Sequence, residues 1–405
     1  NLLLLENRIT GDRIFVIKEA PASTVQLNYP GFDFTVRQGE IKAVGMGISP
    51  ADINDSEWTR VYSAVTGIAL RRDEFGLLAS LRQYQDKIRK HIPGRDEMIL
   101  MNTWGDRSQD KKVNESFAMA ELEAGSRLGI THFQLDDGWQ TGRSANSAFE
   151  GGSFDNIWRN PDYWKPDPSK FPNGLGPLVQ KGKQLGIEVC VWFNPSPDDG
   201  NINWEKDADA LIELYNKYGI RTFKIDGVKM PDKRSEINFR RFLDKVVSAT
   251  DGKAVFNLDV TAGRRAGYHY FNEYGNLFLE NRYTDWRNYY PFWTLRNLWM
   301  LSEYVPSRKL QIEFLNIWRN KVNYASDPLA PSTYPFDYVF AVTMMAQPLA
   351  WFEGTGLPDE AFRSSELIRK YRSIQSDIHK GIILPVGDEP DGYSWTGFQS
   401  VREGE

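Results

Sequence analysis

Eight short apolar runs, each ending in polar or aromatic residues, constrain the fold of this chain more than any other feature. Charged, helix-like segments separate them, and Gly129, Gly186 and Gly219 each stand directly before an apolar residue that leads into a run. A glycine at this place is typical of a helix that ends and passes into a buried strand. The runs cover residues 98–104, 132–137, 188–194, 221–226, 254–259, 276–281, 310–316 and 348–353.

Eight strand–helix units within about 260 residues have the size of a (β/α)8 TIM barrel, an α/β fold. A doubly wound open sheet is the structural competitor, but no glycine-rich phosphate loop follows any of the runs. The pattern therefore favours the barrel. The main helices between the strands are expected over residues 113–128, 174–185, 207–218 and 235–249.

The segments on either side of the barrel have strand-like patterns. Short alternating runs with Gly, Pro and Asn between them, over residues 13–17, 24–28 and 32–36, predict strands and turns. No Met opens the chain, so we expect the numbering to begin inside a longer protein. The predicted units are the C-terminal part of a β-sandwich (1–72), a helical linker (73–97) with a helix over 73–91, the barrel (98–380) with a last helix over 359–379, and the start of a C-terminal β-domain (381–405).

Composition excludes several classes of function. The chain has 49 basic and 54 acidic residues and a net charge of −5, without a basic run, which speaks against a nucleic-acid partner. No apolar stretch reaches the ~18 residues of a membrane span. Cys190 is the only cysteine, which excludes an internal disulfide, and four scattered histidines predict no His-based metal site. The sequence does not indicate a compartment.

Aromatic residues point towards carbohydrate. The chain contains 13 Trp, 18 Tyr and 23 Phe, and several Trp residues stand beside Asp, Asn or Gly. In a barrel the active site forms at the C-terminal ends of the strands. A single aspartate there is commonly a helix cap, but a ring of carboxylates with tryptophans between them fits glycoside hydrolysis better. These strand-end residues are Trp104, Asp136, Asp137, Trp139, Trp192, Asn194, Lys224, Asp226, Asp259, Glu280, Arg282, Asp285, Glu313 and Glu353.

Two of these carboxylates, Asp226 and Asp285, are the candidate catalytic pair. Lys224 precedes Asp226 by two residues, on the same face of its strand. An adjacent cation keeps a carboxylate ionised, as a nucleophile requires. A separation of ~5–5.5 Å between the pair would predict a retaining reaction and one of ~6.5–9.5 Å an inverting one.

Asp136 and Asp137 form a second acidic pair. Sugar hydroxyls are good donors to two adjacent carboxylates, and this interpretation is favoured. A divalent cation is the rival, but no further oxygen ligands follow nearby in the sequence.

The chain resembles the α-galactosidases of glycoside hydrolase family 36, the melibiase-like members of the clan that also holds family 27. Four pieces carry the resemblance, in order and at barrel spacing: Leu-Asp-Asp-Gly-Trp at 135–139, residues 186–195, Phe-Lys-Ile-Asp at 223–226 and residues 347–353. The similarity extends from about Phe15 to Trp395. It implies a β-sandwich before the barrel, a smaller β-domain after it, and retaining hydrolysis of a terminal α-galactoside.

The resemblance also implies roles for individual residues. The family's nucleophile falls on Asp226 and its acid/base on Asp285, while Asp136 and Asp137 match the acids that hold the 4- and 6-hydroxyls of galactose. The other implied substrate-binding positions are Trp104, Trp192, Asn194, Lys224, Thr261, Gly263 and Arg282. The implied partner is an oligosaccharide or glycan, with no metal or other cofactor, and a homo-oligomer is compatible with the family.

Departures from the family's pattern concern the groups that recognise the sugar. The segment after the fifth strand reads Val-Thr-Ala-Gly-Arg at 260–264, without the usual Cys, and Asn194 stands where a Glu is usual. Four alternatives therefore stay open: an α-N-acetylgalactosaminidase, a β-L-arabinopyranosidase, a galactosyl-transferring transglycosidase and a non-catalytic carbohydrate-binding barrel.

Overall fold

In a computed structural model of the protein, the eight predicted runs form a closed barrel of parallel strands. The structure describes all residues except 23–24, 26–31, 71–73, 261–265, 280–281 and 403–405. The barrel strands are β6 (Leu100–Asn102), β7 (His132–Leu135), β8 (Glu188–Phe193), β9 (Thr222–Ile225), β10 (Val255–Asp259), β11 (Gly275–Phe278), β12 (Leu310–Phe314) and β13 (Gln347–Trp351). The predicted (β/α)8 barrel is confirmed.

The barrel closes where its last strand pairs with its first. Leu349 of β13 is in register with Leu100 of β6, which is in register with His132 of β7. Nearly every residue of these strands is buried, because the barrel interior covers one face and the helices cover the other. Apolar runs without a polar face are the sequence pattern that such burial on both sides requires.

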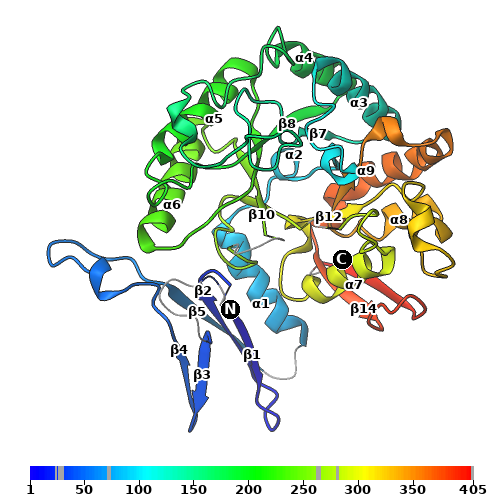
Figure 1. The fold of residues 1–405 in the computed structure, drawn as a ribbon. Helices are drawn as coiled ribbons and strands as arrows, with labels where there is room; N and C mark the ends of the chain where they lie inside the picture. Colours follow the sequence, from blue (N-terminus) through cyan, green and yellow to red (C-terminus); the bar gives the residue numbers. More distant parts are fainter. Residues whose placement is uncertain (23–24, 26–31, 71–73, 261–265, 280–281, 403–405) are drawn as a thin grey trace.

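The helices surround the barrel as predicted, with small shifts at their ends (Figure 1). In α6 (Lys233–Ala249), Phe239, Phe242, Leu243 and Val246 are all buried, at the three- and four-residue spacing of one helix face. Gly129, Gly186 and Gly219 each end a helix in the left-handed conformation, as expected. The helices that follow strands are α3 (Glu115–Leu128), α4 (Gly176–Leu185), α5 (Trp204–Tyr218), α6 (Lys233–Ala249), α7 (Pro291–Ser302), α8 (Phe336–Ala341) and α9 (Ser365–His379).

Short 3-10 helices occupy several of the connections. The helix expected over 359–379 is divided into one such turn and the α-helix α9. The 3-10 segments are η2 (Pro50–Asp52), η3 (Thr103–Asp106), η4 (Ile157–Arg159), η5 (Ser307–Lys309), η6 (Lys321–Tyr324), η7 (Pro331–Thr333), η8 (Gly354–Gly356) and η9 (Asp359–Ser364).

Antiparallel strands flank the barrel at both ends of the chain. The N-terminal part forms a sheet of β1 (Leu2–Glu6), β2 (Arg13–Glu19) and β5 (Ser63–Ala69), and a hairpin of β3 (Phe34–Arg37) and β4 (Glu40–Ala43). Helix α1 (Glu74–Ile88) lies between that sheet and the barrel in Figure 1, and the short α2 (Pro93–Asp96) follows it. Strands β14 (Ile382–Gly387) and β15 (Thr396–Val401) form a C-terminal hairpin.

The sequence expectations for these flanking parts have mixed outcomes. The strand expected over 24–28 falls largely outside the described residues, whereas those over 13–17 and 32–36 correspond to β2 and β3. The proposed domain boundaries at 72, 97 and 380 stay predictions.

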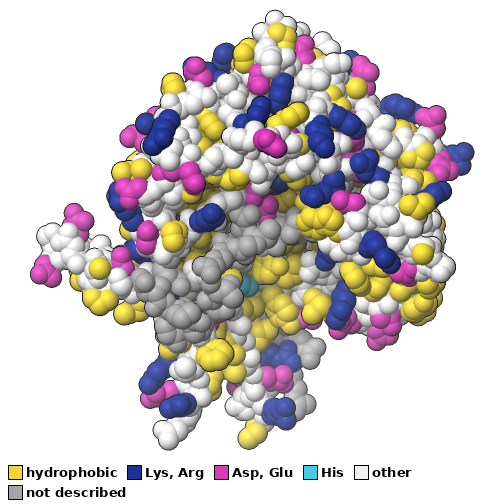
Figure 2. Space-filling model, in the orientation of Figure 1, with side chains coloured by type: hydrophobic (Ala, Val, Ile, Leu, Met, Phe, Trp, Pro, Cys, Tyr) yellow, Lys and Arg dark blue, Asp and Glu magenta, His cyan; other side chains and the backbone are white. Residues whose placement is uncertain are grey.

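Charges of both signs are mixed over the face shown in Figure 2, without a large region of one sign. This distribution agrees with the near balance of basic and acidic residues in the sequence. Among the helices in the described part of the chain, none combines the length and the apolar character that a membrane span requires.

A cluster of large aromatic rings packs against the side chains of β8. Trp164, from the connection between β7 and α4, lies 4.1 Å from Phe193 and 5.8 Å from Trp192, measured between ring centroids. Trp164 is 3% exposed, and Tyr163 meets it edge-on. Since close-packed rings of this size bury a large apolar area, this cluster fixes the strand that carries Trp192.

Replacing Trp164 by Ala tests this support. The substitution removes a buried indole and leaves a cavity, so we expect the free energy of unfolding in urea to fall by about 3–5 kcal/mol. Trp395 is 92% exposed and is the matched control. The Trp395→Ala variant should unfold within about 0.5 kcal/mol of the parent. Equal losses in both variants would contradict the assigned packing.

Candidate active site

The site is organised around one buried ammonium group, that of Lys224 on β9. The side chain is 4% exposed, and its Nζ lies 2.9 Å from Asp136 Oδ2 and 4.0 Å from Asp226 Oδ2. The rings of Phe278 and Trp351 lie beside the ammonium, with centroids 4.5 Å and 5.3 Å from Nζ. The two carboxylates come from β7 and β9, so the barrel brings together the residues that the sequence placed at strand ends.

Lys224 keeps its charge despite its burial. Burial alone would lower the pKa of its ammonium, but the carboxylates of Asp136, Asp226 and Asp259 outweigh that cost and hold the pKa above its usual value. Lys224 is therefore a permanent cation within a ring of carboxylates.

Asp226 directly follows β9 and is the more exposed partner of Lys224. Its side chain is 16% exposed, Oδ2 accepts a hydrogen bond of 3.1 Å from Trp192 Nε1, and Oδ1 accepts one of 2.6 Å from the backbone N–H of Gly227. Gly227 has φ +65°, and a Cβ there would lie 1.6 Å from Asn194 Oδ1. The turn that holds this carboxylate therefore requires glycine.

Asp136 is held from three directions. Its Oδ2 accepts hydrogen bonds from Asn102 Nδ2 at 2.6 Å and from Lys224 Nζ at 2.9 Å, while its Oδ1 accepts one from the backbone N–H of Asp137 at 2.9 Å. These donors leave the carboxylate little freedom to rotate. It is thus a preorganised acceptor.

Asp137 lies in a different environment. Burial raises the pKa of Asp137 to about 6, although its carboxylate accepts hydrogen bonds from Ser144 Oγ and Gln140 Nε2. Among the described residues, neither Asp136 nor Asp137 belongs to a group of three or more ligands arranged to hold a metal ion. Lys224 supplies the positive charge that a metal would otherwise bring to Asp136.

Asp285 follows β11 and is held by a stacked arginine. Its side chain is 35% exposed, and its Oδ2 lies 3.3 Å from Arg107 Nε. The guanidinium of Arg107 lies over the rings of Tyr283 and Trp286, 4.8 Å and 4.6 Å from their centroids. Arg107 is thereby fixed at the carboxylate by aromatic contacts on its planar group.

The remaining predicted site residues differ in exposure and partners. Trp192 is completely buried, and its indole N–H is directed at Asp226, while Trp104 is partly buried in η3 directly after β6. Asn194 is 2% exposed and donates its amide to the backbone oxygen of Pro195. Arg282 forms an ion pair with the fully buried Glu313 of β12. Thr261 and Gly263 lie outside the described residues, as does Glu280.

Sequence reasoning missed several residues that hold the acids in place. Asn102 ends β6 as a polar residue after an apolar run, which is a pattern that could have revealed it. Gln140 and Ser144 lie in the loop after β7, and Arg107 adopts a left-handed conformation in the turn after η3. No pattern in the sequence connects Arg107 with Asp285, because the two are 178 residues apart.

Sequence comparisons find relatives of this chain among the α-galactosidases. The model of the Melibiase family matches residues 72–217. An α-galactosidase of Escherichia coli is 28% identical over 270 residues, which cover 58% of this chain and 36% of the relative. Alpha-galactosidase 2 of Pediococcus pentosaceus is 32% identical over 119 residues, which cover 29% of this chain and 15% of the relative. The chain thus matches only about a third or less of the length of these relatives.

Solved structures extend the likeness to nearly the whole chain. The GH36 α-galactosidase AgaA of Geobacillus stearothermophilus superposes with a TM-score of 0.71 at 14% identity, over 98% of this chain and 59% of that one. An α-galactosidase of Lactobacillus brevis superposes with a TM-score of 0.66 at 14% identity, over 99% of this chain and 58% of that one. At these identities the structural likeness shows the fold. Together with the sequence matches, it makes this chain similar to the GH36 α-galactosidases.

Replacing Lys224 by Met tests the central charge. The variant leaves Asp136 and Asp226 without their buried cation, so we expect the free energy of unfolding at pH 7 to fall by about 3–5 kcal/mol. Lys165→Met is the matched control, because Lys165 pairs with Asp162 at the surface, where both side chains are more than half exposed. The control should leave the urea unfolding curve unchanged. An equally stable Lys224→Met protein would show that this cation does not stabilise the site.

Proposed function

We propose that this chain is a retaining exo-glycosidase that hydrolyses terminal non-reducing α-D-galactosyl residues from oligosaccharides or glycans. Asp226 is the nucleophile and Asp285 the acid/base. One observation carries the proposal: a partly exposed aspartate at the C-terminal end of a barrel strand is held beside a buried ammonium group and accepts an indole N–H. This position and environment suit an ionised nucleophile.

In the first step, a carboxylate oxygen of Asp226 attacks the anomeric carbon while the bond from that carbon to the leaving oxygen breaks. Asp285 gives its proton to the leaving oxygen. The Trp192 indole and the Gly227 N–H hold the attacking carboxylate in one orientation. The product of this step is a glycosyl ester on Asp226 and a free alcohol.

In the second step, the Asp285 carboxylate takes a proton from water, and the water oxygen attacks the anomeric carbon. The ester bond to Asp226 breaks and releases its carboxylate. Two inversions at the same carbon return the original configuration. Arg107 holds Asp285 from one side, which leaves its exposed side open to a leaving group or to water.

Asp136 and Asp137 are the proposed acceptors for the galactose hydroxyls. Both are buried beside Lys224 or its partners, and each carboxylate is already oriented by side-chain donors. Galactose hydroxyls would donate to their remaining lone pairs. Two structures of one protein of the same fold support an oligosaccharide substrate: variants of AgaA were solved in complex with raffinose and with stachyose.

Substitution of the two catalytic candidates tests their roles. Asp285→Ala should lower kcat on raffinose about 10²–10⁴-fold, because a poor leaving group has to receive a proton from Asp285 as its bond breaks. Asp226→Ala should abolish turnover of raffinose and of nitrophenyl α-galactoside alike. Asp199→Asn is the control, because Asp199 is an exposed loop residue that pairs with Arg234.

Azide distinguishes the two roles further. It should rescue Asp226→Ala with β-galactosyl azide as product, and Asp285→Ala with α-galactosyl azide, as identified by NMR. Near-normal turnover by either variant on raffinose would contradict the assignment.

The raised pKa of Asp137 predicts a pH dependence. In the free protein its carboxylate is charged above pH about 6 and protonated below, and protonation turns one of its two acceptor oxygens into a donor. We therefore expect kcat/KM for nitrophenyl α-galactoside to fall about tenfold per pH unit below pH 6. The Asp137→Asn variant should have a lower kcat/KM at pH 7 and lack this acidic limb. A limb that persists unchanged in the variant would assign it to another group.

Asp137 also makes the stability of the protein depend on pH, but stability decreases as the pH rises, whereas the expected activity increases. The folded state binds more protons at Asp137 than the unfolded chain does between pH about 4 and 6. Its contribution to the free energy of unfolding therefore decreases as the pH rises through this window. The decrease is complete above the folded pKa.

A panel of nitrophenyl glycosides separates the alternatives that the sequence leaves open. A preference for α-N-acetylgalactosaminide or β-L-arabinopyranoside over α-galactoside would keep the mechanism and change the sugar. Transfer products that exceed free galactose in the presence of excess acceptor would indicate a transglycosidase. Calorimetric binding of galactose without any hydrolysis would indicate a carbohydrate-binding barrel.

A further inference from the structure

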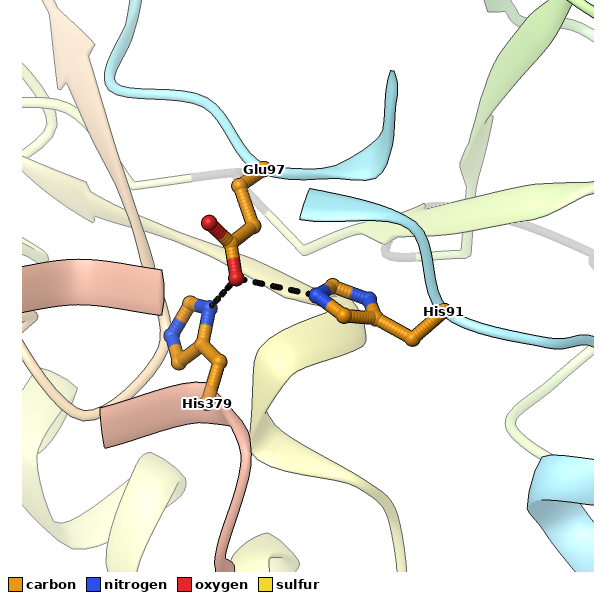
Figure 3. Close-up of side chains that lie close together, drawn as sticks. All are labelled: His91, Glu97 and His379. Carbon is orange, nitrogen blue, oxygen red and sulfur yellow. Dashed lines mark hydrogen bonds and ion pairs between the residues drawn. The ribbon is translucent and has the colours of Figure 1, made fainter. Parts of the chain in front are cut away.

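Three potential metal ligands meet at the opposite end of the barrel from the candidate active site. Figure 3 shows His91 and Glu97, which lie on either side of the short α2, and His379, with their polar atoms directed at the same point. His91 follows α1, Glu97 precedes β6, and His379 is the last residue of α9. Their side chains are 12%, 6% and 0% exposed.

Two of the three distances between the ligand atoms are close to those of a tetrahedral site. Glu97 Oε1 lies 2.9 Å from His91 Nε2 and 3.1 Å from His379 Nδ1, and all three atoms lie within 4.8 Å of one another. Zinc bonds of 2.0–2.2 Å to nitrogen and oxygen place neighbouring ligands about 3.3 Å apart. Glu97 Oε1 already has nearly this spacing from each imidazole nitrogen, and around such an ion the two nitrogens, which lie within 4.8 Å of each other, would take up the same spacing.

The hydrogen-bond partners around the cluster match those of metal ligands. His379 Nε2 lies 3.2 Å from the backbone oxygen of Ala346. A neutral imidazole has one N–H, so when Nε2 donates to Ala346, Nδ1 presents a lone pair to Glu97 Oε1. Two lone pairs would then face each other without a proton between them. A cation bound to both atoms would remove this repulsion. The Ser376 hydroxyl holds the other carboxylate oxygen of Glu97, and such outer partners are typical of ligating carboxylates and histidines.

We propose that His91, Glu97 and His379 bind a divalent transition metal, with Zn²⁺ the best match to two imidazoles and a carboxylate, and with water as the fourth ligand. The partly exposed His91 gives the ion a way in. The rival arrangement is a doubly protonated His379 that donates to both of its partners. The first arrangement predicts that the protein takes up metal, and the rival predicts that it does not.

The site lies at the seam where the barrel closes. Glu97 leads into β6, Ala346 leads directly into β13, and these two strands pair with each other. His379 ends α9, so the last helix of the barrel also reaches this seam. A bound ion would therefore connect the residue that leads into the first strand with the last helix, whose His379 also contacts the residue before the last strand. Since this end of a barrel serves stability, we expect the metal to act on unfolding and to leave kcat unchanged.

Metal content and thermal stability test the proposal. The whole chain is incubated with Zn²⁺, passed through a desalting column, and measured by elemental analysis and by thermal unfolding. We expect about one Zn²⁺ per chain, a Tm that rises by roughly 2–5 °C with excess Zn²⁺ and falls back with EDTA. Co²⁺ should give the strong visible absorption of a four-coordinate site.

Two variants assign the ion to these residues. His91→Gln removes the most exposed ligand, so the protein should fold, lose the bound Zn²⁺ and lose the Co²⁺ absorption. His132→Gln is the matched control, because His132 also lies near a carboxylate, 3.9 Å from Glu188, at the start of β7. It should keep both. Less than about 0.2 Zn²⁺ per chain in the parent, or unchanged binding in His91→Gln, would overturn the proposal.

Discussion

The buried ammonium of Lys224 is the charge on which the candidate site depends. One lysine at the end of β9 lies within reach of acids from three strand ends, and their combined attraction outweighs the cost of its burial. Without that cation, Asp136 and Asp226 would repel each other in a poorly solvated interior. The arrangement therefore couples the carboxylate that we propose to attack the sugar with the one that we propose to hold it.

The two proposed catalytic acids lie in different surroundings, as acid/base chemistry with two carboxylates requires. Asp226 is fixed by an indole N–H and a backbone N–H and is only 16% exposed. Asp285 is more exposed, and Arg107, stacked on aromatic rings, holds it. Strands and buried rings thus support the nucleophile, whereas a loop after β11 carries the acid/base.

Much of this architecture was predictable because local rules determine it. Alternation of apolar runs with glycine-terminated helices is a local pattern, and it predicted every barrel strand. Parallel strands end at one face, so Asp136, Lys224 and Asp226 could be expected to meet. Contacts between distant loops were not predictable: Arg107 reaches Asp285 across 178 residues, and Glu97 reaches His379 across 282. The orientation of Trp192 also escaped prediction, since a tryptophan at a strand end is equally compatible with a sugar contact and with a buried donor to Asp226.

Trapping of the glycosyl ester tests the central claim most directly. A 5-fluoro-α-D-galactosyl fluoride slows the second step more than the first, so the covalent intermediate accumulates and its peptide can be identified by mass spectrometry. The account predicts one fluorogalactosyl group per chain, on the peptide that contains Asp226 and on that side chain. A label on another carboxylate, or turnover of α-galactosides without any covalent label, would contradict it.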